Sequence, residues 1–371
     1  MKIIRVGITG ANGLLGWHLR AYLHRHKEIE VLCADRACFE DSGLLDKFVS
    51  NVDAIAHFAG MNRGADGELE ATNIGLTEAL IAACQRMSVS PHILHSSSTH
   101  VERDTAYGRS KRVSAELLRA WSKQSGAKFT NIILPHVFGE FGKPFYNSVV
   151  STFCHQIAGA EIPKIIDDSN LELVHTQDVA QLFYKSIVEG DCSELRLQGV
   201  PITVEKLLSK IVKMAENYAE QIIPDVRNAL DLRIFNTYRS YLFPNKYPVP
   251  LQVHTDARGG LFEAVKSENG GQMFFSTTKP NITRGNHYHT RKIERFLVTH
   301  GVATICLRKI FTQEIHSFSV TGDTPCYIDM PTFYTHNITN TGNDILTTAF
   351  WAHEIFDRQD PDTFAELVEP L

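Results

Sequence analysis

The stretch Thr9-Gly10-Ala11-Asn12-Gly13-Leu14-Leu15-Gly16 decides the fold of the first half of the chain. It follows an apolar run at residues 3–8, and Leu15, Leu19 and Leu23 then recur at helical spacing. The pattern predicts a glycine-rich turn that leads from a buried strand into a helix. Glycines at such a turn let the backbone approach a pyrophosphate at the helix N-terminus, because no Cβ atom is in the way. We therefore expect dinucleotide binding here; the alternative is a tight turn without a ligand.

Further apolar runs of strand length follow the glycine-rich turn, at residues 31–34, 54–58, 92–96 and 131–134. The segments between them are long enough for crossover helices. This alternation predicts an α/β, Rossmann-like doubly wound parallel sheet with helices on both faces. Apolar residues at helical spacing in 203–241 predict two more helices, which we expect to complete the substrate side of the same domain.

A proline-rich segment then interrupts the pattern. Three prolines fall within residues 244–250, and proline opposes both helix and central strand. We therefore predict a first domain at 1–243, a linker at 244–250 and a second domain at 251–371. The second domain reads as short strands between turns, which favours an all-β sandwich or barrel, with jelly-roll topology expected. Within it, only residues 362–368 look helical.

Composition limits the possible partners. The net charge of −5 is small for 371 residues, and no run of Lys or Arg stands out, so we expect neither nucleic acid nor an anionic membrane as a partner. The seven cysteines are scattered without a CxxC pair, which suits free thiols. No signal peptide or membrane-spanning run is visible. We expect a cytoplasmic protein and a homodimer.

The end of the second predicted strand bears on cofactor choice. Asp35 suits an adenine-ribose hydroxyl, whereas the neighbouring Arg36 suits a 2′-phosphate through bidentate contacts. Both are present, so NADH stays open while NADPH is favoured. The alternative for Arg36 is a solvated loop charge.

Two further motifs complete a family pattern. After the TGxxGxxG turn come His57-Phe58-Ala59-Gly60 and Tyr107-Gly108-Arg109-Ser110-Lys111. Together they resemble the extended short-chain dehydrogenase/reductase family, over about residues 1–240. Tyr107 and Lys111 lie four apart on a predicted helix and so share a face.

The resemblance implies that Tyr107 donates a proton to a reduced carbonyl and that Ser98, rather than Ser96 or Ser97, orients it. It also implies that Lys111 holds the nicotinamide ribose and lowers the pKa of the phenol. The expected cofactor contacts are Gly7, Gly10, Asn12, Gly13, Leu14, Gly16, Asp35, Arg36, Ala59 and Lys111.

Departures from that family narrow the chemistry. Only eight residues separate Ser98 from Tyr107, which indicates a trimmed loop over the active site. The Thr-Asp-Glu triplet of sugar-nucleotide dehydratases is absent, so dehydration is disfavoured and keto reduction is expected. Lys143 and Asn147 lie between two later motifs of the family and are candidate diphosphate or sugar contacts, with an ordinary loop role as the alternative.

A second candidate site lies in the β-rich part. His287 and His289 are two residues apart and would face one side of a strand. With Glu294 and His336 they offer three nitrogens and one oxygen, a set suited to Zn²⁺ or another divalent metal. The surrounding spacing resembles the cupin motifs, over about residues 250–371. For Glu294 and His336, a place in an ordinary β-core is the alternative.

A competing reading assigns His287 a different role. Arg284-Gly285-x-His287 also resembles the deoxysugar-nucleotide 3,5-epimerases, where the matching histidine is a base, and Arg284 would then contact the substrate. A neutral imidazole suits removal of a proton next to a ketone. If His287 binds metal instead, the base could be Tyr334, His300 or a metal-bound hydroxide. The metal would then be a Lewis acid or purely structural.

Taken end to end, the chain resembles capsular-polysaccharide enzymes that join a short-chain reductase to a cupin. That resemblance implies C3 epimerisation of a UDP-2-acetamido-2,6-dideoxy-4-hexulose and NADPH-dependent reduction at C4. The product would be UDP-2-acetamido-2,6-dideoxy-β-L-talose, on the route to UDP-N-acetyl-L-fucosamine. The alternatives are a reductase with a structural or dimerising cupin, and an NADP(H) sensor without turnover.

Overall fold

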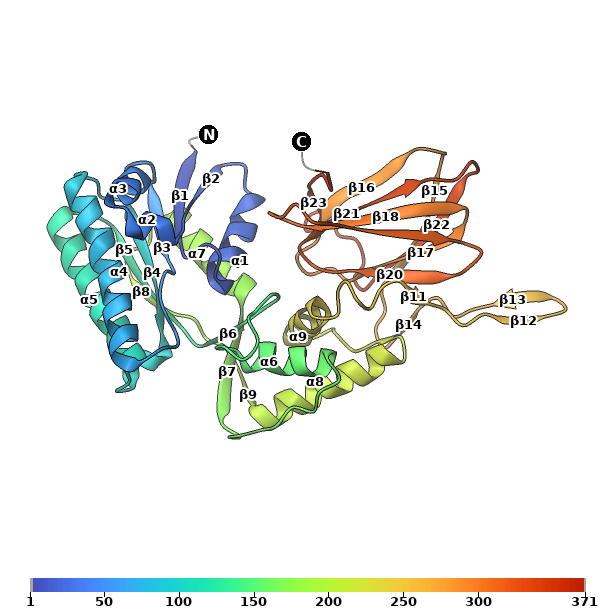
Figure 1. Cartoon of the computed structure of the whole chain (residues 1–371), viewed down its shortest axis with the longest axis horizontal. Coiled ribbons are helices and arrows are strands. Elements are labelled where there is room, and N and C mark those ends of the chain that lie inside the picture. The colour runs from blue at the N-terminus through green and yellow to red at the C-terminus, as the bar shows by residue number, and fades with distance from the viewer. Residues whose placement is uncertain (1–2, 370–371) are drawn as a thin grey trace. The chain divides into compact units, whose positions relative to one another are not determined.

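The computed structural model describes residues 3–369 (Figure 1). The chain forms two compact units. The first consists of Met1–Thr152 and Ile165–Val204, and the second of Phe153–Lys164 and Glu205–Leu371. Each unit is described below by itself.

A parallel sheet forms the centre of the first unit, as the alternating pattern predicts. Its six strands are ordered β2-β1-β3-β4-β5-β8, and every neighbouring pair is parallel. The strands are β1 (Ile4–Thr9), β2 (Ile29–Ala34), β3 (Ala54–His57), β4 (His92–Ser98), β5 (Phe129–Leu134) and β8 (Glu194–Arg196).

Helices cover both faces of this sheet, because successive strand residues point to opposite sides. On one face Leu19 and Phe183 pack with Ala56, and on the other Leu80 packs with Ile55. Both clusters are fully buried, so the doubly wound prediction is confirmed. The helices are α1 (Leu14–His24) and α7 (Thr176–Glu189) on the first face, and α3 (Ser42–Ser50), α4 (Asp66–Arg86) and α5 (Ala106–Ser125) on the second.

The strand order brings two loops together at the carboxyl edge of the sheet. The chain runs from β1 outward to β2 and then returns to place β3 on the other side of β1. Ligands of open α/β sheets bind where the strand order reverses in this way. The remaining elements of this part are α2 (Arg36–Glu40), η1 (Thr99–Glu102), β6 (His136–Phe138), α6 (Val149–Ala158), β7 (Asn170–His175) and β9 (Val200–Thr203).

The second unit is rich in antiparallel strands, as predicted for an all-β region. Two five-stranded sheets, ordered β11-β20-β17-β22-β15 and β19-β18-β21-β16-β23, share a buried core to which Phe296, Phe350, Ile305 and Ile338 contribute. Jelly-roll topology stays a prediction. The strands are β11 (Val249–Pro250), β15 (Gln272–Thr278), β16 (Thr283–Tyr288), β17 (Glu294–His300), β18 (Val302–Lys309), β19 (Ile315–Thr321), β20 (Cys326–Met330), β21 (Tyr334–Asn340), β22 (Leu346–Ala352) and β23 (Phe364–Ala365).

Short strands complete this unit. A hairpin of β12 (His254–Asp256) and β13 (Gly259–Leu261) reaches out from the β-rich region (Figure 1). A second small sheet pairs β10 (Ile222–Ile223) with β14 (Lys266–Ser267).

Two helices of the predicted reductase lobe contact the β-rich part instead. These are α8 (Val204–Ala219) and α9 (Ala229–Ser240). The Tyr218 hydroxyl donates a 2.6 Å hydrogen bond to Asp329, and the Arg239 guanidinium donates to the carbonyl of Met330 at 2.8 Å. One boundary between the compact units lies at 204/205, and residues 153–164 also belong to the second unit, whereas the domain division with a linker at 244–250 stays a prediction. Helical periodicity predicts a helix but not the surface against which it packs.

The helix predicted at 362–368 is wrong. Phe364–Ala365 forms β23, which pairs with His287 and Tyr288 of β16. Asp362, just before it, has a φ of +42°, which no α-helical residue adopts. The apolar spacing of this segment reflects alternating contacts along a strand rather than a helical face.

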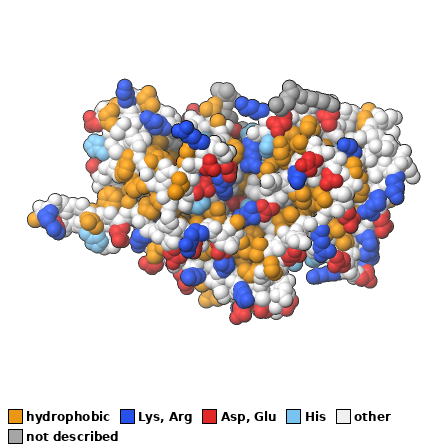
Figure 2. All heavy atoms as spheres, turned by 180° about the vertical axis from the view of Figure 1, so that it is seen from behind, with side chains coloured by type: hydrophobic (Ala, Val, Ile, Leu, Met, Phe, Trp, Pro, Cys, Tyr) orange, Lys and Arg blue, Asp and Glu red, His pale blue; other side chains and the backbone are white. Residues whose placement is uncertain are grey.

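On the face drawn in Figure 2, acidic and basic side chains are interspersed. The seven cysteines are free. None of the helices within residues 3–369 has the length and apolar character needed to span a membrane.

Candidate active sites

The glycine-rich turn leaves the start of α1 open to an anion. Gly13 is the N-cap residue, and no side chain caps the helix. A Cβ atom at Gly16 would lie 2.3 Å from the carbonyl oxygen of Gly10, and one at Gly10 would lie 2.9 Å from the Ala59 nitrogen. These close approaches require glycine, and the first N–H groups of the helix remain for a ligand such as a pyrophosphate. Asn12 is exposed at the same turn.

Thr9 joins this turn to the loop after β3. Its hydroxyl contacts Nδ1 of His57 at 2.8 Å and accepts a hydrogen bond from the Ala59 nitrogen at 3.2 Å. Burial lowers the pKa of His57 to about 3, so the imidazole is neutral. Gly7 is the exception among the predicted cofactor contacts: a Cβ there would meet the ring of Phe48 at 2.5 Å, so its neighbours are core side chains.

Asp35 and Arg36 differ in their surroundings. Asp35 accepts a hydrogen bond from the Cys38 nitrogen at 3.2 Å as the N-cap of α2. The Arg36 side chain is 93% exposed and pairs with Glu40 at 3.1 Å. Such an exposed pair contributes at most about 1 kcal/mol, so the guanidinium can leave it for a phosphate.

The predicted reductase residues converge at the carboxyl end of β4. The Ser98 side chain opposes the rise in the pKa of Tyr107, and its hydroxyl accepts a hydrogen bond from the His100 nitrogen at 3.2 Å. Ser96 instead donates to the carbonyl of His57 at 3.2 Å, so Ser98 is the serine of the three that influences the tyrosine. The Lys111 ammonium lies 5.8 Å from the centre of the Tyr107 ring and donates to the Ser96 carbonyl at 2.8 Å.

Burial controls the ionisation of this pair. It raises the pKa of Tyr107 to about 12, against the opposing hydrogen bond from Ser98. It also lowers the pKa of Lys111 to about 8. The lowering of the Tyr107 pKa that the resemblance implies is therefore not produced by the protein side chains, which leave this pKa raised. A tyrosine held in its protonated form remains suited to donate a proton.

Two residues that the sequence did not predict affect Tyr107 or the helix that carries it. The buried amide of Asn73 accepts from the Met61 nitrogen at 2.6 Å and donates to the hydroxyl of Ser110 at 3.1 Å. Ser110 in turn donates to the carbonyl of Tyr107 at 2.9 Å. Asn73 therefore links the loop after β3 to α5. Asn73 belongs to none of the motifs in the sequence. Its burial on α4 indicates a role, but burial is seen only in the structure.

The second missed residue is Tyr146, whose charge would raise the pKa of Tyr107 further. It lies in the loop of the predicted substrate contacts, where Lys143 and Asn147 are both exposed. The Lys143 ammonium lies 5.4 Å from the Tyr146 ring centre, and the guanidinium of Arg63 lies 6.0 Å from it. The loop thus brings positive charge toward the neighbourhood of Tyr107.

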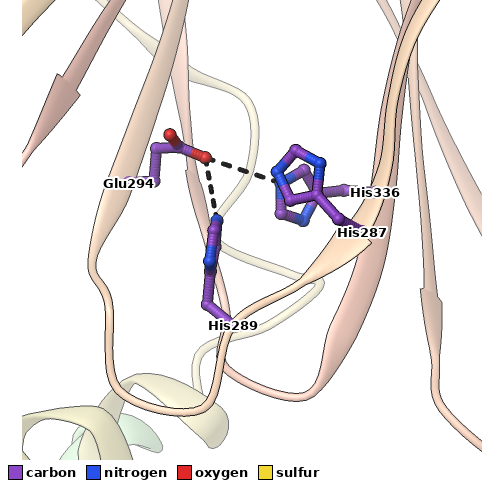
Figure 3. A group of neighbouring side chains, drawn as sticks. All are labelled: His287, His289, Glu294 and His336. Carbon is purple, nitrogen blue, oxygen red and sulfur yellow. Dashed lines mark hydrogen bonds and ion pairs between the residues drawn. The ribbon is translucent and has the colours of Figure 1, made fainter. Parts of the chain in front are cut away.

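The four predicted metal ligands form one cluster in the second unit. His287, His289, Glu294 and His336 each offer an atom, and these atoms all lie within 4.8 Å of one another. Figure 3 shows Glu294 reaching toward two imidazoles, with its Oε2 at 3.1 Å from His289 Nε2 and 3.5 Å from His336 Nε2. Zn²⁺ bonds of about 2.1 Å would set neighbouring ligands roughly 3.4 Å apart, close to the 3.1 and 3.5 Å contacts of Glu294, whereas ligand atoms as much as 4.8 Å apart would have to move closer together.

Hydrogen bonds fix which nitrogens face the cluster. Nδ1 of His289 contacts the carbonyl of Asp362 at 2.5 Å, and Nδ1 of His336 contacts the carbonyl of Tyr334 at 3.1 Å. A carbonyl only accepts, so each Nδ1 carries a proton, and Nε2 is the nitrogen that would present a lone pair to a bound metal. The buried Nε2 of His336 has no hydrogen-bond partner within the described chain. This donor set fits a divalent cation.

Charges in the cluster are strongly coupled. Burial lowers the pKa of His287 to about 3, with further lowering by His336 and His289. Burial would raise the pKa of Glu294, but the electrostatic influence of the nearby imidazoles of His289 and His336 holds it well below its usual range. The cluster therefore combines a neutral imidazole with an ionised carboxylate, the protonation states that metal ligation requires.

A bulge brings Arg284 to the same side as His287. The register of β16 against β21 shifts between Gly285 and His287, so Arg284 pairs with Ile338 and His287 with His336. Gly285 has a φ of +103°, and a Cβ there would meet the His336 carbonyl at 2.7 Å. Because paired residues share a face, Arg284 and His287 both point toward the side of the sheet that carries His336. The Arg284 guanidinium bonds the Thr278 hydroxyl at 3.0 Å.

Two known protein families match successive parts of the chain. Residues 6–194 match the NAD dependent epimerase/dehydratase family. The chain belongs to this family. A nicotinamide cofactor follows from that membership. Residues 254–364 match the polysaccharide biosynthesis C-terminal domain.

Relatives align along nearly the whole chain. UDP-2-acetamido-2,6-beta-L-arabino-hexul-4-ose reductase of Pseudomonas aeruginosa is 35% identical over 369 residues, 98% of each chain. The crystal structure of the capsular polysaccharide assembling protein CapF from Staphylococcus aureus matches with a TM-score of 0.63 and 32% identity, over 98% of this chain and 99% of that one. RMD from Pseudomonas aeruginosa, complexed with NADPH, shares the fold at 20% identity and a TM-score of 0.53, over 57% of this chain and 84% of its own.

Proposed function

We propose that the chain is a bifunctional nucleotide-sugar enzyme. The β-rich part would invert C3 of a UDP-2-acetamido-2,6-dideoxy-4-hexulose, and the first unit would reduce its C4 ketone with NADPH. The observation that carries the proposal is the presence of two groups of candidate site residues in one chain: Tyr107 with the ammonium of the buried Lys111 5.8 Å from its ring centre, and a cluster of three imidazoles with one carboxylate. The relatives that align over 98% of the chain are a UDP-hexul-4-ose reductase and a capsule assembly protein.

Reduction at C4 uses Tyr107 and Ser98. Their hydroxyls would hold the C4 carbonyl oxygen, and Tyr107 would transfer its proton to that oxygen as the C4–H bond forms. Bound NADPH supplies the hydride. The protonated Lys111 would orient the nicotinamide ribose and offset charge on the phenolate left behind. The exposed Lys143 and Asn147 are proposed contacts of the substrate diphosphate or sugar.

Inversion at C3 needs a base beside the ketone. The C4 carbonyl acidifies the C3 proton, and a neutral imidazole can remove it. His287 is neutral because burial lowers its pKa to about 3, which suits metal ligation; as the base it would need bound substrate to raise that pKa toward neutrality. Arg284, on the same side of the sheet, is the proposed substrate contact. A divalent metal, with Zn²⁺ favoured, would be held by His289, Glu294, His336 and His287 and would supply a Lewis acid.

One observation favours a second candidate. The cluster offers four protein ligands, the number found in closed structural zinc sites, whereas catalytic sites keep one position open. On this reading the chain is an NADPH-dependent 4-keto-sugar reductase whose cupin region is structural or dimerising. The two candidates differ in whether the C3 proton exchanges.

Cofactor choice, location and assembly are parts of the same proposal. NADPH is favoured because Asp35 caps α2 while the Arg36 side chain is 93% exposed beside it. A cytoplasmic location accords with seven free thiols. Homodimerisation is tested by the mass of the protein in solution.

Proton NMR of the 4-keto UDP-sugar in D₂O tests the division of labour. The full chain is compared with Tyr107→Phe, without and with NADPH, following the C3 proton signal and NADPH oxidation. We expect the variant to lose NADPH oxidation by about 10²- to 10⁴-fold, the usual contribution of a general acid, and to keep C3 exchange. The full chain is needed because Tyr218 and Arg239, outside 251–371, bond to β20.

The reciprocal variant completes the design. His289→Ala should lose C3 exchange while NADPH oxidation of an already epimerised sugar continues. Equal loss of both activities in Tyr107→Phe would overturn the division of labour. Absence of C3 exchange in the wild-type protein, with reduction intact, would favour the monofunctional reductase.

A further inference from the structure

One carboxylate outside the cluster holds the loop that joins its ligands. Residues 290–293 connect His289 to Glu294, and Asp362 accepts hydrogen bonds from three successive nitrogens of this loop. These are Thr290 at 3.0 Å, Arg291 at 2.9 Å and Lys292 at 2.8 Å, and the Thr290 hydroxyl adds a fourth bond at 2.6 Å. Three consecutive N–H groups can converge on one carboxylate only if the loop is tightly curved.

The backbone of Asp362 contacts the cluster itself. Its carbonyl oxygen accepts the Nδ1 proton of His289 at 2.5 Å, which turns Nε2 of that imidazole toward Glu294. Asp362 is 1% exposed and has a φ of +42°, a conformation that Asp and Asn tolerate better than most residues. One residue thus fixes both the loop and the ring orientation.

The carboxylate has no other evident use. Within the described chain it forms no ion pair, and it is not a member of the ligand cluster. The nearby cationic side chains contact other groups. Arg291 pairs with Glu354 at 3.1 Å and with Asp360 at 2.8 Å. The Lys292 ammonium donates to the Pro361 carbonyl at 2.7 Å. A buried charge satisfied by loop N–H groups stabilises loop geometry.

We propose that Asp362 is a positioning residue of the metal site, holding His289 and Glu294 at their ligating separation from the far end of the chain. This inference rests on the metal site in the proposed function. The structural reason is that His289 and Glu294 are joined by only four residues, so the curvature of that loop sets how closely their donor atoms approach. Partners behind the ligands typically change metal affinity by about 10- to 100-fold.

The test compares metal affinity in full-length variants. Asp362→Asn keeps the size and the φ preference but replaces one accepting oxygen with an amide that faces an N–H donor. Asp360→Asn is the matched control, because it removes the same charge two residues away from an exposed position that contacts only the Arg291 side chain. Zn²⁺ affinity is measured by competition with a chromophoric chelator, and Co²⁺ spectra report the coordination geometry. Thermal melting of the metal-free proteins checks folding.

We expect Asp362→Asn to weaken Zn²⁺ binding by about 10- to 100-fold and to alter the Co²⁺ spectrum, while Asp360→Asn matches the wild type. Thr290→Val, which removes only the hydroxyl bond, should give a smaller loss and serves if Asp362→Asn does not fold. Asp362→Glu keeps the negative charge but lengthens the side chain by one methylene group, which displaces the carboxylate from the loop N–H groups. Its Zn²⁺ affinity should therefore stay below that of the wild type.

The failures are distinguishable. If the wild type does not bind Zn²⁺, or if His336→Ala leaves its Zn²⁺ binding intact, the metal site of the proposed function is wrong. This inference is then wrong as well. If the wild type binds Zn²⁺ and Asp362→Asn or Thr290→Val matches it in affinity and spectrum, the inference alone is overturned. Recovery by Asp362→Glu would show that charge rather than position matters and would also overturn it.

Discussion

The two candidate sites are built in opposite ways. The proposed dinucleotide site of the first unit depends on backbone: glycines bring the turn after β1 against Ala59, and the helix end is left without a side-chain cap. The cluster of the second unit depends on side chains, which converge from β16 and the loop after it, from β17 and from β21, and the carbonyl of Asp362 contacts one of them, His289. Adding a Cβ atom at a glycine should disrupt a site built from backbone. Removing a hydrogen-bond partner should disrupt a site built from side chains. This difference can be tested by substitution in each unit.

The largest expected effect concerns buried charge in the second unit. Arg295 forms two bonds with Asp329, at 2.7 and 2.9 Å, and both side chains are at most 1% exposed. Arg295→Met would leave Asp329 buried without its main cation and should lower the free energy of unfolding by about 3–5 kcal/mol. Denaturant unfolding of the variant measures this loss.

The control for that variant comes from the first unit. Arg119 pairs with Glu194 at 3.0 Å, but the two side chains are 43% and 53% exposed. Arg119→Met should therefore cost less than about 1 kcal/mol. Similar losses in both variants would show that buried charge does not distinguish the second unit.

The next effect concerns added atoms in the first unit. Gly16→Ala would place a Cβ 2.3 Å from the carbonyl oxygen of Gly10, and overpacking of this kind costs about 1–3 kcal/mol. Because the clash lies within the turn, we expect weaker NADPH binding as well as lower stability. NADPH fluorescence titration and thermal melting measure the two effects.

Gly75→Ala is the matched control, since a Cβ there meets no atom within 4 Å in the middle of α4. It should stabilise the protein by about 0.5–1 kcal/mol and leave NADPH binding unchanged. Unchanged NADPH binding in Gly16→Ala would contradict the view that this turn is a backbone site.

The same difference explains what the sequence could predict. The glycine-rich turn, the Tyr107 and Lys111 pair and the imidazole cluster were all predictable, because each depends on residues that lie close together in sequence or carry a distinctive motif. Asp362 was not, since its function depends on a contact 72 residues away with the Thr290 hydroxyl. The contact between α8 and β20 was missed for the same reason, because a helical pattern predicts a helix but not the surface against which it packs. The direction of the Tyr107 pKa shift was missed because burial, which the motif does not reveal, raises the pKa more than Ser98 lowers it.

The smallest effect concerns pH and separates two lysines. Burial lowers the pKa of Lys111 from 10.5 to about 8. Since the ammonium form is needed and Tyr107 stays protonated to about pH 12, reduction should fall about tenfold for each pH unit above 8. The contribution of this group to stability should change in the opposite direction. Its folded pKa lies below the unfolded value, so the unfolded chain binds the proton more tightly, and the free energy of unfolding rises between pH 8 and 10.5.

Lys246 provides the control in the second unit, because burial lowers its pKa to about 8 as well. Its ammonium lies 3.9 Å from the centre of the Tyr218 ring and donates to the Tyr218 carbonyl at 3.1 Å. Lys246→Met should therefore keep the pH profile of NADPH oxidation measured from pH 6 to 10. If the fall above pH 8 disappears in this variant, the titrating group belongs to the second unit, and reduction depends on both units rather than on the backbone site alone.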